Sequence, residues 1–160
     1  MTWADVSLKE FQDALASSAP TPGGGSAAGV ALGQAAALAV MVSDLTLGNE
    51  TLREGWAISE QVKAIAIPML EEGLKLATED SEAFDKVVDS FKLPKDTEQP
   101  KSERREAIRS ATLGAAEVPY RTAVSALHLL KLLPELASKG NPNAASDVGV
   151  ASLLASAALK

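Results

Sequence analysis

The sequence predicts an all-α fold: a single-domain bundle of long, bent helices. Two features of the composition carry this prediction, because hydrophobic residues make up 46% of the 160 residues while aromatic residues make up only 4%. Much of the apolar content is Ala and Leu, which favour helices, and the aromatic and β-branched residues that favour strands are scarce. The chain is long enough for one core and shows no internal repeat or linker, so we expect one domain over residues 1–160.

A capping box predicts where the first helix begins. Ser7 can cap this helix while the side chain of Glu10 reaches back to the Ser7 amide. Apolar residues then recur on one helix face until about residue 17. Two prolines and three glycines follow, and they exclude regular structure before the next helix.

The later helices are delimited by Gly, Pro and Asn residues. The predicted helices run from Gly25 or Ser26 to Gly48, from Asn49 to Thr78, from Asp80 to Phe91, from Ser102 to Ser138, and from a start between Ala144 and Asp147 to Lys160. Polar segments at Leu93–Pro100 and Gly140–Asn143 would connect them. We expect bends at Pro68 and Pro119 and an irregularity near Pro134, because an interior proline lacks a backbone donor and clashes with the preceding turn.

Three glycines recur every four residues in the second predicted helix, at Gly25, Gly29 and Gly33. They leave a bare stripe that a neighbouring helix backbone can approach closely. The stretch from Ala27 to Val42 is almost free of polar residues, but its roughly 16 residues are fewer than the about 20 that span a bilayer. A buried helix of a soluble bundle is therefore favoured over a membrane span.

Charge and composition exclude several classes of function. The net charge of -6 argues against non-specific nucleic-acid binding and against docking on an anionic membrane. The absence of Cys excludes disulfides, thiolate catalysis and Cys–zinc sites, and it is compatible with the cytosol. The N-terminus lacks the basic start and apolar run of a signal peptide. The single histidine, His128, falls on a polar helix face, so we expect neither a zinc site nor a Ser-His-Asp triad.

The glycine-rich turn Pro22–Ser26 leads directly into the second predicted helix. Free amides and the helix dipole make such a turn attractive to anions. The turn is not a nucleotide-binding signature, because no strand precedes it and no lysine follows the glycines. A tight connection that lets two helices touch explains the same residues equally well.

Two aspartates stand at the head of predicted apolar helix faces. Asp80 shares a face with Phe84, Val87, Val88 and Phe91, and Asp147 shares one with Val150, Ala151, Leu154 and Ala158. A carboxylate at the edge of an apolar surface loses hydration, which raises its pKa and suits a general acid or base. Both residues also lie near predicted helix starts, and from the sequence alone N-capping is the favoured interpretation.

The segment Lys92–Arg109 carries six basic and four acidic residues in a chain that is acidic overall. Its local excess of positive charge could attract an anionic small molecule. An ordinary solvated helix start is the alternative, and the sequence alone favours it.

Four blocks of sequence occur along the chain in a recognisable order. They are residues 18–26 (SAPTPGGGS) with Leu38–Thr46, Asp80–Phe84 with Lys92–Lys95, Arg105–Ala111 with Val118–Pro119, and Gly140–Asn141 with Ser146–Ala151. Together they resemble the cyclodeaminase and methenyltetrahydrofolate cyclohydrolase domain of the formiminotransferase-cyclodeaminase family. Two departures are evident: the segment Asn49–Arg53 lacks the basic, Tyr-containing pattern of the family, and the family continues past Lys160 with a helix that bears an Asn-Val pair.

The resemblance implies an enzyme that acts on the carbon bridging N5 and N10 of tetrahydrofolate. One branch of the family cyclises 5-formiminotetrahydrofolate with loss of ammonia, and the other hydrolyses 5,10-methenyltetrahydrofolate to 10-formyltetrahydrofolate. Neither reaction needs a metal or a redox cofactor, so we expect a folate substrate as the only ligand, in a cytoplasmic homodimer. A stand-alone domain favours the cyclohydrolase branch. A non-catalytic folate-binding protein and a helical oligomerisation module remain alternatives.

The resemblance also implies roles for particular residues. Asp80 and Asp147 become the catalytic carboxylates, with Asp80 the better candidate for proton transfer. The residues expected to bind substrate are Pro22, Gly23, Gly24, Gly25 and Ser26 in the turn, Lys92, Lys95 and Arg105 for the glutamate tail, and Asn141.

Overall fold

The computed structural model describes residues 2–94 and 98–160, with the backbone alone for residues 98–100. Over these ranges the chain is helical and contains no β-strand, so the predicted all-α class is confirmed. The α-helices are α1 (Leu8–Leu15), α2 (Gly24–Leu47), α3 (Trp56–Lys92), α4 (Glu98–Leu130), α5 (Leu133–Lys139) and α6 (Ala145–Leu159). Short 3-10 helices form at η1 (Trp3–Asp5), η2 (Glu50–Gly55) and η3 (Pro142–Ala144).

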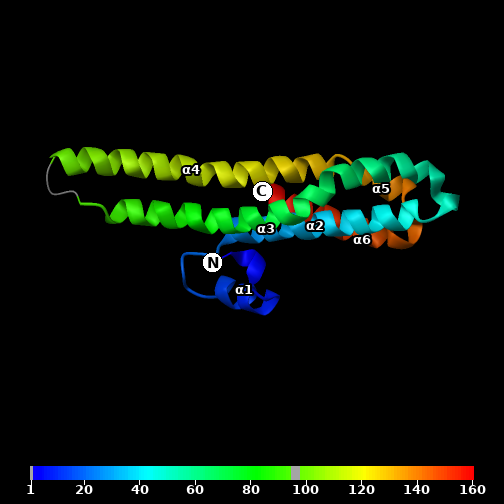
Figure 1. The fold of residues 1–160 in the computed structure, drawn as a ribbon, viewed down its shortest axis with the longest axis horizontal. Coiled ribbons are helices and arrows are strands. Elements are labelled where there is room, and N and C mark those ends of the chain that lie inside the picture. Colours follow the sequence, from blue (N-terminus) through cyan, green and yellow to red (C-terminus); the bar gives the residue numbers. More distant parts are fainter. Residues whose placement is uncertain (1, 95–97) are drawn as a thin grey trace.

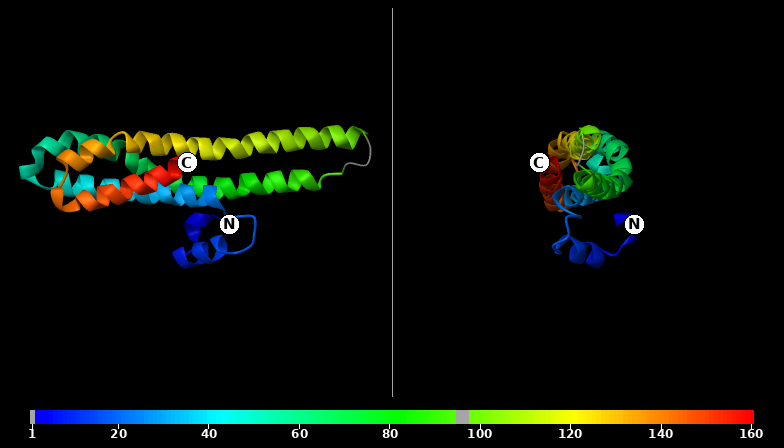
Figure 2. Two further views of the ribbon diagram at one scale, coloured as in Figure 1. Left: turned by 180° about the vertical axis from the view of Figure 1, so that it is seen from behind. Right: turned by 90° about the vertical axis from the view of Figure 1, so that its left-hand side faces the viewer.

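The long helices run along a common axis (Figure 1). α3 and α4 form an antiparallel hairpin that projects beyond α2 and α6, while α1 lies against one side of the bundle (Figures 1 and 2). α3 contains Pro68 and changes direction in its first half, as the sequence predicted (Figure 1). The capping box at Ser7 and Glu10 is formed at the start of α1.

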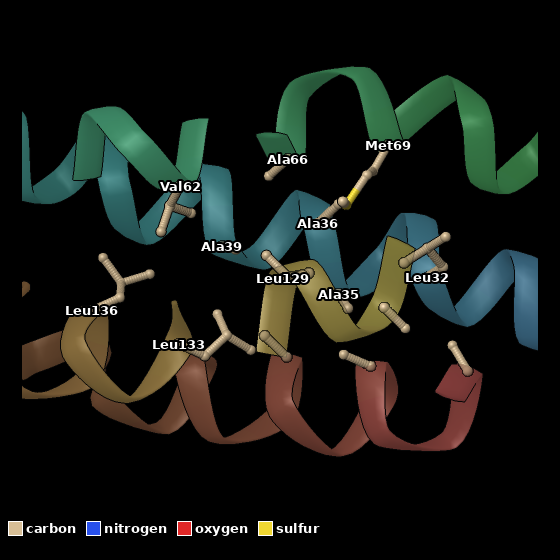
Figure 3. Close-up of a cluster of buried hydrophobic side chains, with 14 of the residues drawn as sticks. Leu32, Ala35, Ala36, Ala39, Val62, Ala66, Met69, Leu129, Leu133 and Leu136 are labelled. Atoms are coloured by element: carbon tan, nitrogen blue, oxygen red, sulfur yellow. The ribbon is translucent and has the colours of Figure 1, made fainter. Parts of the chain in front are cut away.

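The core consists of small and medium-sized aliphatic side chains around α2. Leu32 and the alanines of α2 face α3 on one side and α6 with the end of α4 on the other (Figure 3). The buried residues labelled there are Leu32, Ala35, Ala36, Ala39, Val62, Ala66, Met69, Leu129, Leu133 and Leu136. Because these side chains are small, the helix axes lie close together. By length and composition α2 could cross a membrane, but its buried face packs inside this bundle.

α2 and α3 are in backbone contact where their glycines meet. A Cβ added at Gly29 would lie 2.7 Å from the carbonyl oxygen of Gly73, and one added at Gly73 would lie 2.6 Å from the carbonyl oxygen of Gly29. A Cβ at Gly33 would lie 3.6 Å from the Leu70 oxygen, which is an ordinary contact. The predicted close approach is therefore confirmed, and it is tightest at Gly29.

The predicted break between Thr78 and Asp80 is wrong. α3 continues through this segment from Trp56 to Lys92, so Asp80 lies within a helix and does not cap one. The polar residues around this predicted break have partners across the fold, because Thr78 and Ser81 accept hydrogen bonds from Trp3. These partners allow hydroxyl side chains to lie inside a helix that sequence preferences alone would have ended.

The predicted helix Ser102–Ser138 is divided into two helices in the structure, and the predicted irregularity near Pro134 is confirmed. α4 begins earlier, at Glu98, and passes through Pro119 without ending. The chain breaks after Leu130, and α5 follows with Pro134 in its first turn. A proline is tolerated there because the first amides of a helix have no helical partner.

Asn49 caps a shorter element than predicted. Its side-chain oxygen accepts a hydrogen bond from the Thr51 amide at the start of η2, and α3 begins only at Trp56. The last helix, α6, begins at Ala145 and ends at Leu159, in agreement with the predicted start and close to the predicted end.

Candidate active site

The glycine-rich turn brings the N-terminus of α2 against the middle of α3. Gly23 precedes the first residue of α2, and no side chain caps its free amides. The turn is fixed to α3 by Thr21, whose hydroxyl donates to Asp85 Oδ1 at 3.0 Å, and Pro22 is buried. A fixed helix N-terminus with free amides is a favourable place for negative charge.

Asp80 places its carboxylate at this helix N-terminus. A Cβ added at Gly25 would lie 2.5 Å from Asp80 Cγ, so the glycine provides the space that the carboxylate occupies. The hydroxyl of Ser26 donates to Asp80 Oδ2 at 3.0 Å. The structure therefore brings together three of the residues that the sequence singled out, and it half-buries the carboxylate.

Two further residues extend this cluster, and sequence reasoning gave neither of them a role. The Ser81 hydroxyl lies 2.9 Å from that of Ser26, and both serines are buried. Trp3 donates its indole N–H to Ser81 Oγ at 2.9 Å, across 78 positions of sequence. No local pattern could have identified this contact, because it depends on how the N-terminal segment folds against α3.

A pocket of about 440 Å³ opens beside the turn. Its walls come from the start of α2, the middle of α4 and the end of α6: Gly24, Gly25, Ala28, Pro119, Thr122, Ala123, Ala157, Ala158, Leu159 and Lys160. The volume suits a small-molecule ligand. Parts of three of the four sequence blocks thus converge, since the turn and Pro119 line the pocket and Asp80 lies against Gly25.

A second hollow of about 470 Å³ lies between α3 and α4 on the projecting hairpin. Glu79, Glu82 and Lys86 line it, and Glu79 accepts a hydrogen bond from Arg121 at 2.6 Å. This hollow touches neither the glycine-rich turn nor Asp80. We therefore centre the candidate site on the pocket at the start of α2.

Asn141 and Asp147 lie toward the opposite end of α2 from Asp80. The Asn141 amide donates to Thr46 Oγ1 at 3.0 Å. Ser26 and Thr46 are separated by 20 residues of one continuous helix, which corresponds to about 30 Å. The Asn141 side chain caps η3. Asn141 therefore lies far from the Asp80 cluster of the same chain.

Asp147 occupies the first turn of α6, whereas the last turn of that helix lines the pocket. Ten residues separate Asp147 from Ala157, or about 15 Å along the helix axis. Asp147 does not provide the N-cap, which is Ala144 without a side-chain bond. The predicted pair of carboxylates therefore does not assemble within a single chain.

Two of the predicted tail-binding cations, Lys92 and Arg105, lie on the projecting hairpin. Lys92 is exposed and pairs with Asp89 at 2.8 Å, about 18 Å along α3 from Asp80. Arg105 is exposed on α4, and Lys95 falls outside the residues that the structure describes. His128 is exposed on α4, as predicted. Among the side chains that the structure describes, no group of three or more His, Asp or Glu is arranged to hold a metal ion.

Fold and site together define an all-α protein with a carboxylate beside a small-molecule pocket at a glycine-rich helix start. The chain belongs to the formiminotransferase-cyclodeaminase family, whose sequence pattern matches residues 7–160. The methenyltetrahydrofolate cyclohydrolase of Methylorubrum extorquens is 39% identical over 153 residues, which cover 96% of this chain and 74% of that protein. The formimidoyltransferase-cyclodeaminase of Gallus gallus is 31% identical over 152 residues, which cover 95% of this chain and 28% of that protein.

A solved structure shares the fold. The crystal structure of formiminotetrahydrofolate cyclodeaminase from Thermotoga maritima matches with a TM-score of 0.83 and 32% sequence identity. The match covers 97% of this chain and 73% of that one. The resemblance inferred from the four sequence blocks is thus confirmed by both sequence and structure.

Proposed function

We propose that this protein is a folate one-carbon enzyme that hydrolyses 5,10-methenyltetrahydrofolate to 10-formyltetrahydrofolate. The observation that carries the proposal is the Asp80 carboxylate, held at the N-terminus of α2 next to a pocket of about 440 Å³. The relative named as a methenyltetrahydrofolate cyclohydrolase is 39% identical over almost the whole chain, which supports this branch of the family.

Asp80 can serve the proton transfers that this hydrolysis requires. Water attacks the electron-poor carbon between N5 and N10, and the carboxylate accepts the proton that the water loses. When the resulting hydroxyl adduct collapses, the protonated Asp80 gives its proton to N5 as the C–N5 bond breaks. The carboxylate takes up the hydroxyl proton as the formyl C=O forms, and it then releases this proton to solvent. A carboxylate near this carbon also stabilises the positive charge of the methenyl bridge.

Cyclisation of 5-formiminotetrahydrofolate with loss of ammonia is the second candidate reaction. The Thermotoga maritima structure, named as a formiminotetrahydrofolate cyclodeaminase, supports it through the shared fold. The same carboxylate would deliver a proton to the leaving nitrogen as N10 attacks the formimino carbon. The chain spans only 28% of the Gallus gallus protein, so the formimidoyl-transfer activity named there is not part of this proposal.

The test is to follow the near-ultraviolet absorbance of 5,10-methenyltetrahydrofolate with and without the protein, at a pH where the ring opens slowly by itself. Faster decay supports the cyclohydrolase. With no acceleration, the band should instead form from 5-formiminotetrahydrofolate if the protein is a cyclodeaminase. If neither substrate is turned over, the catalytic proposal is wrong, and folate binding without turnover would indicate a non-catalytic relative.

The proposal also covers cofactors, the glutamate tail of the substrate and the cellular location. No metal or redox cofactor takes part in either proposed reaction. The exposed Lys92 and Arg105, together with Lys95, would attract the glutamate tail of the substrate. We place the enzyme in the cytoplasm. Proteins of this reducing compartment rarely contain disulfides, so a chain without Cys is compatible with it.

A homodimer completes the proposal. The outer faces of α4 and α6 expose large apolar side chains, including Leu113 (74% exposed), Tyr120 (65%) and Leu153 (73%), and such faces often mark subunit contacts. A second copy would also supply a route by which Asp147 reaches an Asp80 site. Sedimentation at micromolar concentration should show a dimer that Leu153→Glu weakens. A wild-type monomer would contradict the proposal.

A further inference from the structure

We propose that Trp3 is a positioning residue for the reaction, acting on Asp80 through the hydroxyls of Ser81 and Ser26. The inference rests on the proposed role of Asp80 in proton transfer. Trp3 precedes residues 7–160, which match the family, so the contact is not part of the matched family pattern.

Trp3 is held on α3 by both of its N–H groups. Its backbone amide donates to Thr78 Oγ1 at 2.9 Å, and its indole N–H donates to Ser81 Oγ at 2.9 Å. Its ring also packs edge-to-face on Phe11, with the ring centroids 5.4 Å apart. These three contacts fix the direction of the indole N–H relative to α3.

The hydrogen bonds that follow have only one consistent direction. An indole N–H can only donate and an ionised carboxylate can only accept, whereas each serine hydroxyl carries one hydrogen. Ser26 uses its hydrogen for Asp80 Oδ2, so the bond between the two serines must be donated by Ser81. The order is therefore Trp3 to Ser81 to Ser26 to Asp80, and aligned donors of this kind reinforce one another.

This arrangement gives the two oxygens of Asp80 different roles. Oδ2 is occupied by the Ser26 hydroxyl. Oδ1 is the carboxylate atom nearest to the position of a Cβ at Gly25, the glycine that lines the pocket. Trp3 thus holds the hydroxyl chain in the orientation that keeps Oδ2 an acceptor and leaves Oδ1 to exchange protons with the substrate.

The kinetic test uses Trp3→Phe, which keeps an aromatic ring for Phe11 but removes the indole N–H. We expect kcat to fall about three- to tenfold, with KM changed less than about twofold, because one link in the chain loses its fixed direction. Ser26→Ala removes the bond to the carboxylate and should lower kcat about ten- to hundredfold. Trp56→Phe is the matched control, because it removes the indole bond to the Thr46 carbonyl at the far end of α2.

The double variant Trp3→Phe/Ser26→Ala separates positioning from general support of the fold. If Trp3 acts through Ser26, the double variant should match Ser26→Ala within about twofold, since the chain is already broken. Two effects that multiply would overturn the proposal, as would an unchanged kcat in a folded Trp3→Phe. If Trp3→Phe does not fold, Ser81→Ala takes its place in the same cycle, with the same outcomes.

A spectroscopic measurement tests the hydrogen-bond chain without turnover. The protein has two Trp residues, so its nitrogen-15 spectrum should show two indole N–H resonances. Ser26→Ala should shift the Trp3 resonance and leave that of Trp56 in place, whereas an unmoved Trp3 resonance would overturn the chain. A wild-type protein inert toward both folates with a responsive Trp3 resonance would refute the proposed function and not the hydrogen-bond chain.

Discussion

Glycines at the two ends of α2 leave space for different kinds of neighbour. At the N-terminal end, the missing Cβ of Gly25 makes room for the Asp80 side chain. Beside the C-terminal end, a Cβ on Gly55 of η2 would lie 2.9 Å from the Lys139 carbonyl carbon, so this glycine makes room for backbone. A side chain can rotate away from an added methyl group, but a packed backbone cannot. Substitutions at the first end should therefore affect activity, and those at the middle and far end should affect stability.

The largest expected effect is that of Asp80→Asn. Removing a proton-transfer group should lower kcat about a hundred- to ten-thousandfold, while the Ser26 hydroxyl can still donate to the amide oxygen and preserve the fold. Asp147→Asn is the comparison at the other end of the molecule, and steady-state turnover of the methenyl substrate measures both. A smaller loss of kcat for Asp147→Asn would agree with the distance between Asp147 and the Asp80 cluster within one chain. Full turnover in both variants would rule out carboxylate proton transfer.

Gly29→Ala should cause the largest loss of stability of the α2 substitutions, because its methyl group would meet the backbone of α3 on a buried face. Overpacking of this kind costs about 1–3 kcal/mol or more. Gly33→Ala is the matched control on the same stripe, and helix propensity favours it by up to about 1 kcal/mol. Urea unfolding of both variants gives the difference. Equal stabilities would contradict the close contact at Gly29.

Gly25→Ala should affect activity more than stability. The added methyl group would displace the Asp80 carboxylate from the start of α2, and misplacing a reacting group by about 1 Å can cost a hundredfold in rate. Gly24→Ala adds the same methyl group one residue earlier, with nothing within 4 Å, and should lose less activity. The check compares kcat with the urea midpoint for each variant. A Gly25→Ala protein with unchanged kcat would mean that the carboxylate position does not matter.

Thr46→Val should lower stability without a selective loss of kcat. The buried Thr46 hydroxyl accepts from the Asn141 amide and donates to the Val42 carbonyl, and Val keeps its shape without these bonds. Leaving the Asn141 amide without a partner costs about 1–3 kcal/mol. Thr51→Val, at an exposed position, is the control in the same urea experiment. A Thr46→Val protein as stable as Thr51→Val would contradict the prediction and show that the C-terminal end of α2 tolerates the loss of these two hydrogen bonds.

The smallest effect should come from acid at the capping box of α1. Hydrogen bonds from the Ser7 hydroxyl, and then from the Ser7 amide, lower the pKa of Glu10 from its ordinary value of 4.5. A lowered folded-state pKa means that this stabilisation is present above pH 4.5 and is lost as the pH falls through the lowered value. Amide exchange in α1 should therefore become faster in acid. Glu10→Gln should remove that pH dependence. If amide exchange in the wild-type protein and in Glu10→Gln had the same pH profile, the prediction would be contradicted.

The sequence by itself determined the local features of this protein. The composition predicted the all-α class, Ser7 and Glu10 predicted the first cap, and Gly29 predicted the close helix contact. The glycine-rich turn and Asp80 were also singled out from sequence. The cap and the close contact are confirmed because capping and the absence of a Cβ act within a few residues of chain or along one helix face. The roles of the turn and of Asp80 stay predictions.

Only the tertiary structure decided the continuity of α3 and the membership of the site. The segment from Thr78 to Ser81 resembles a helix start, but Trp3 and Ser26 provide partners from distant positions and the helix continues. The same packing gathers the glycine-rich turn, Asp80 and Pro119 at one end of α2 and leaves Asp147 away from them. The physical reason is that these contacts join residues tens of positions apart, and their energies depend on how whole helices dock rather than on any local pattern.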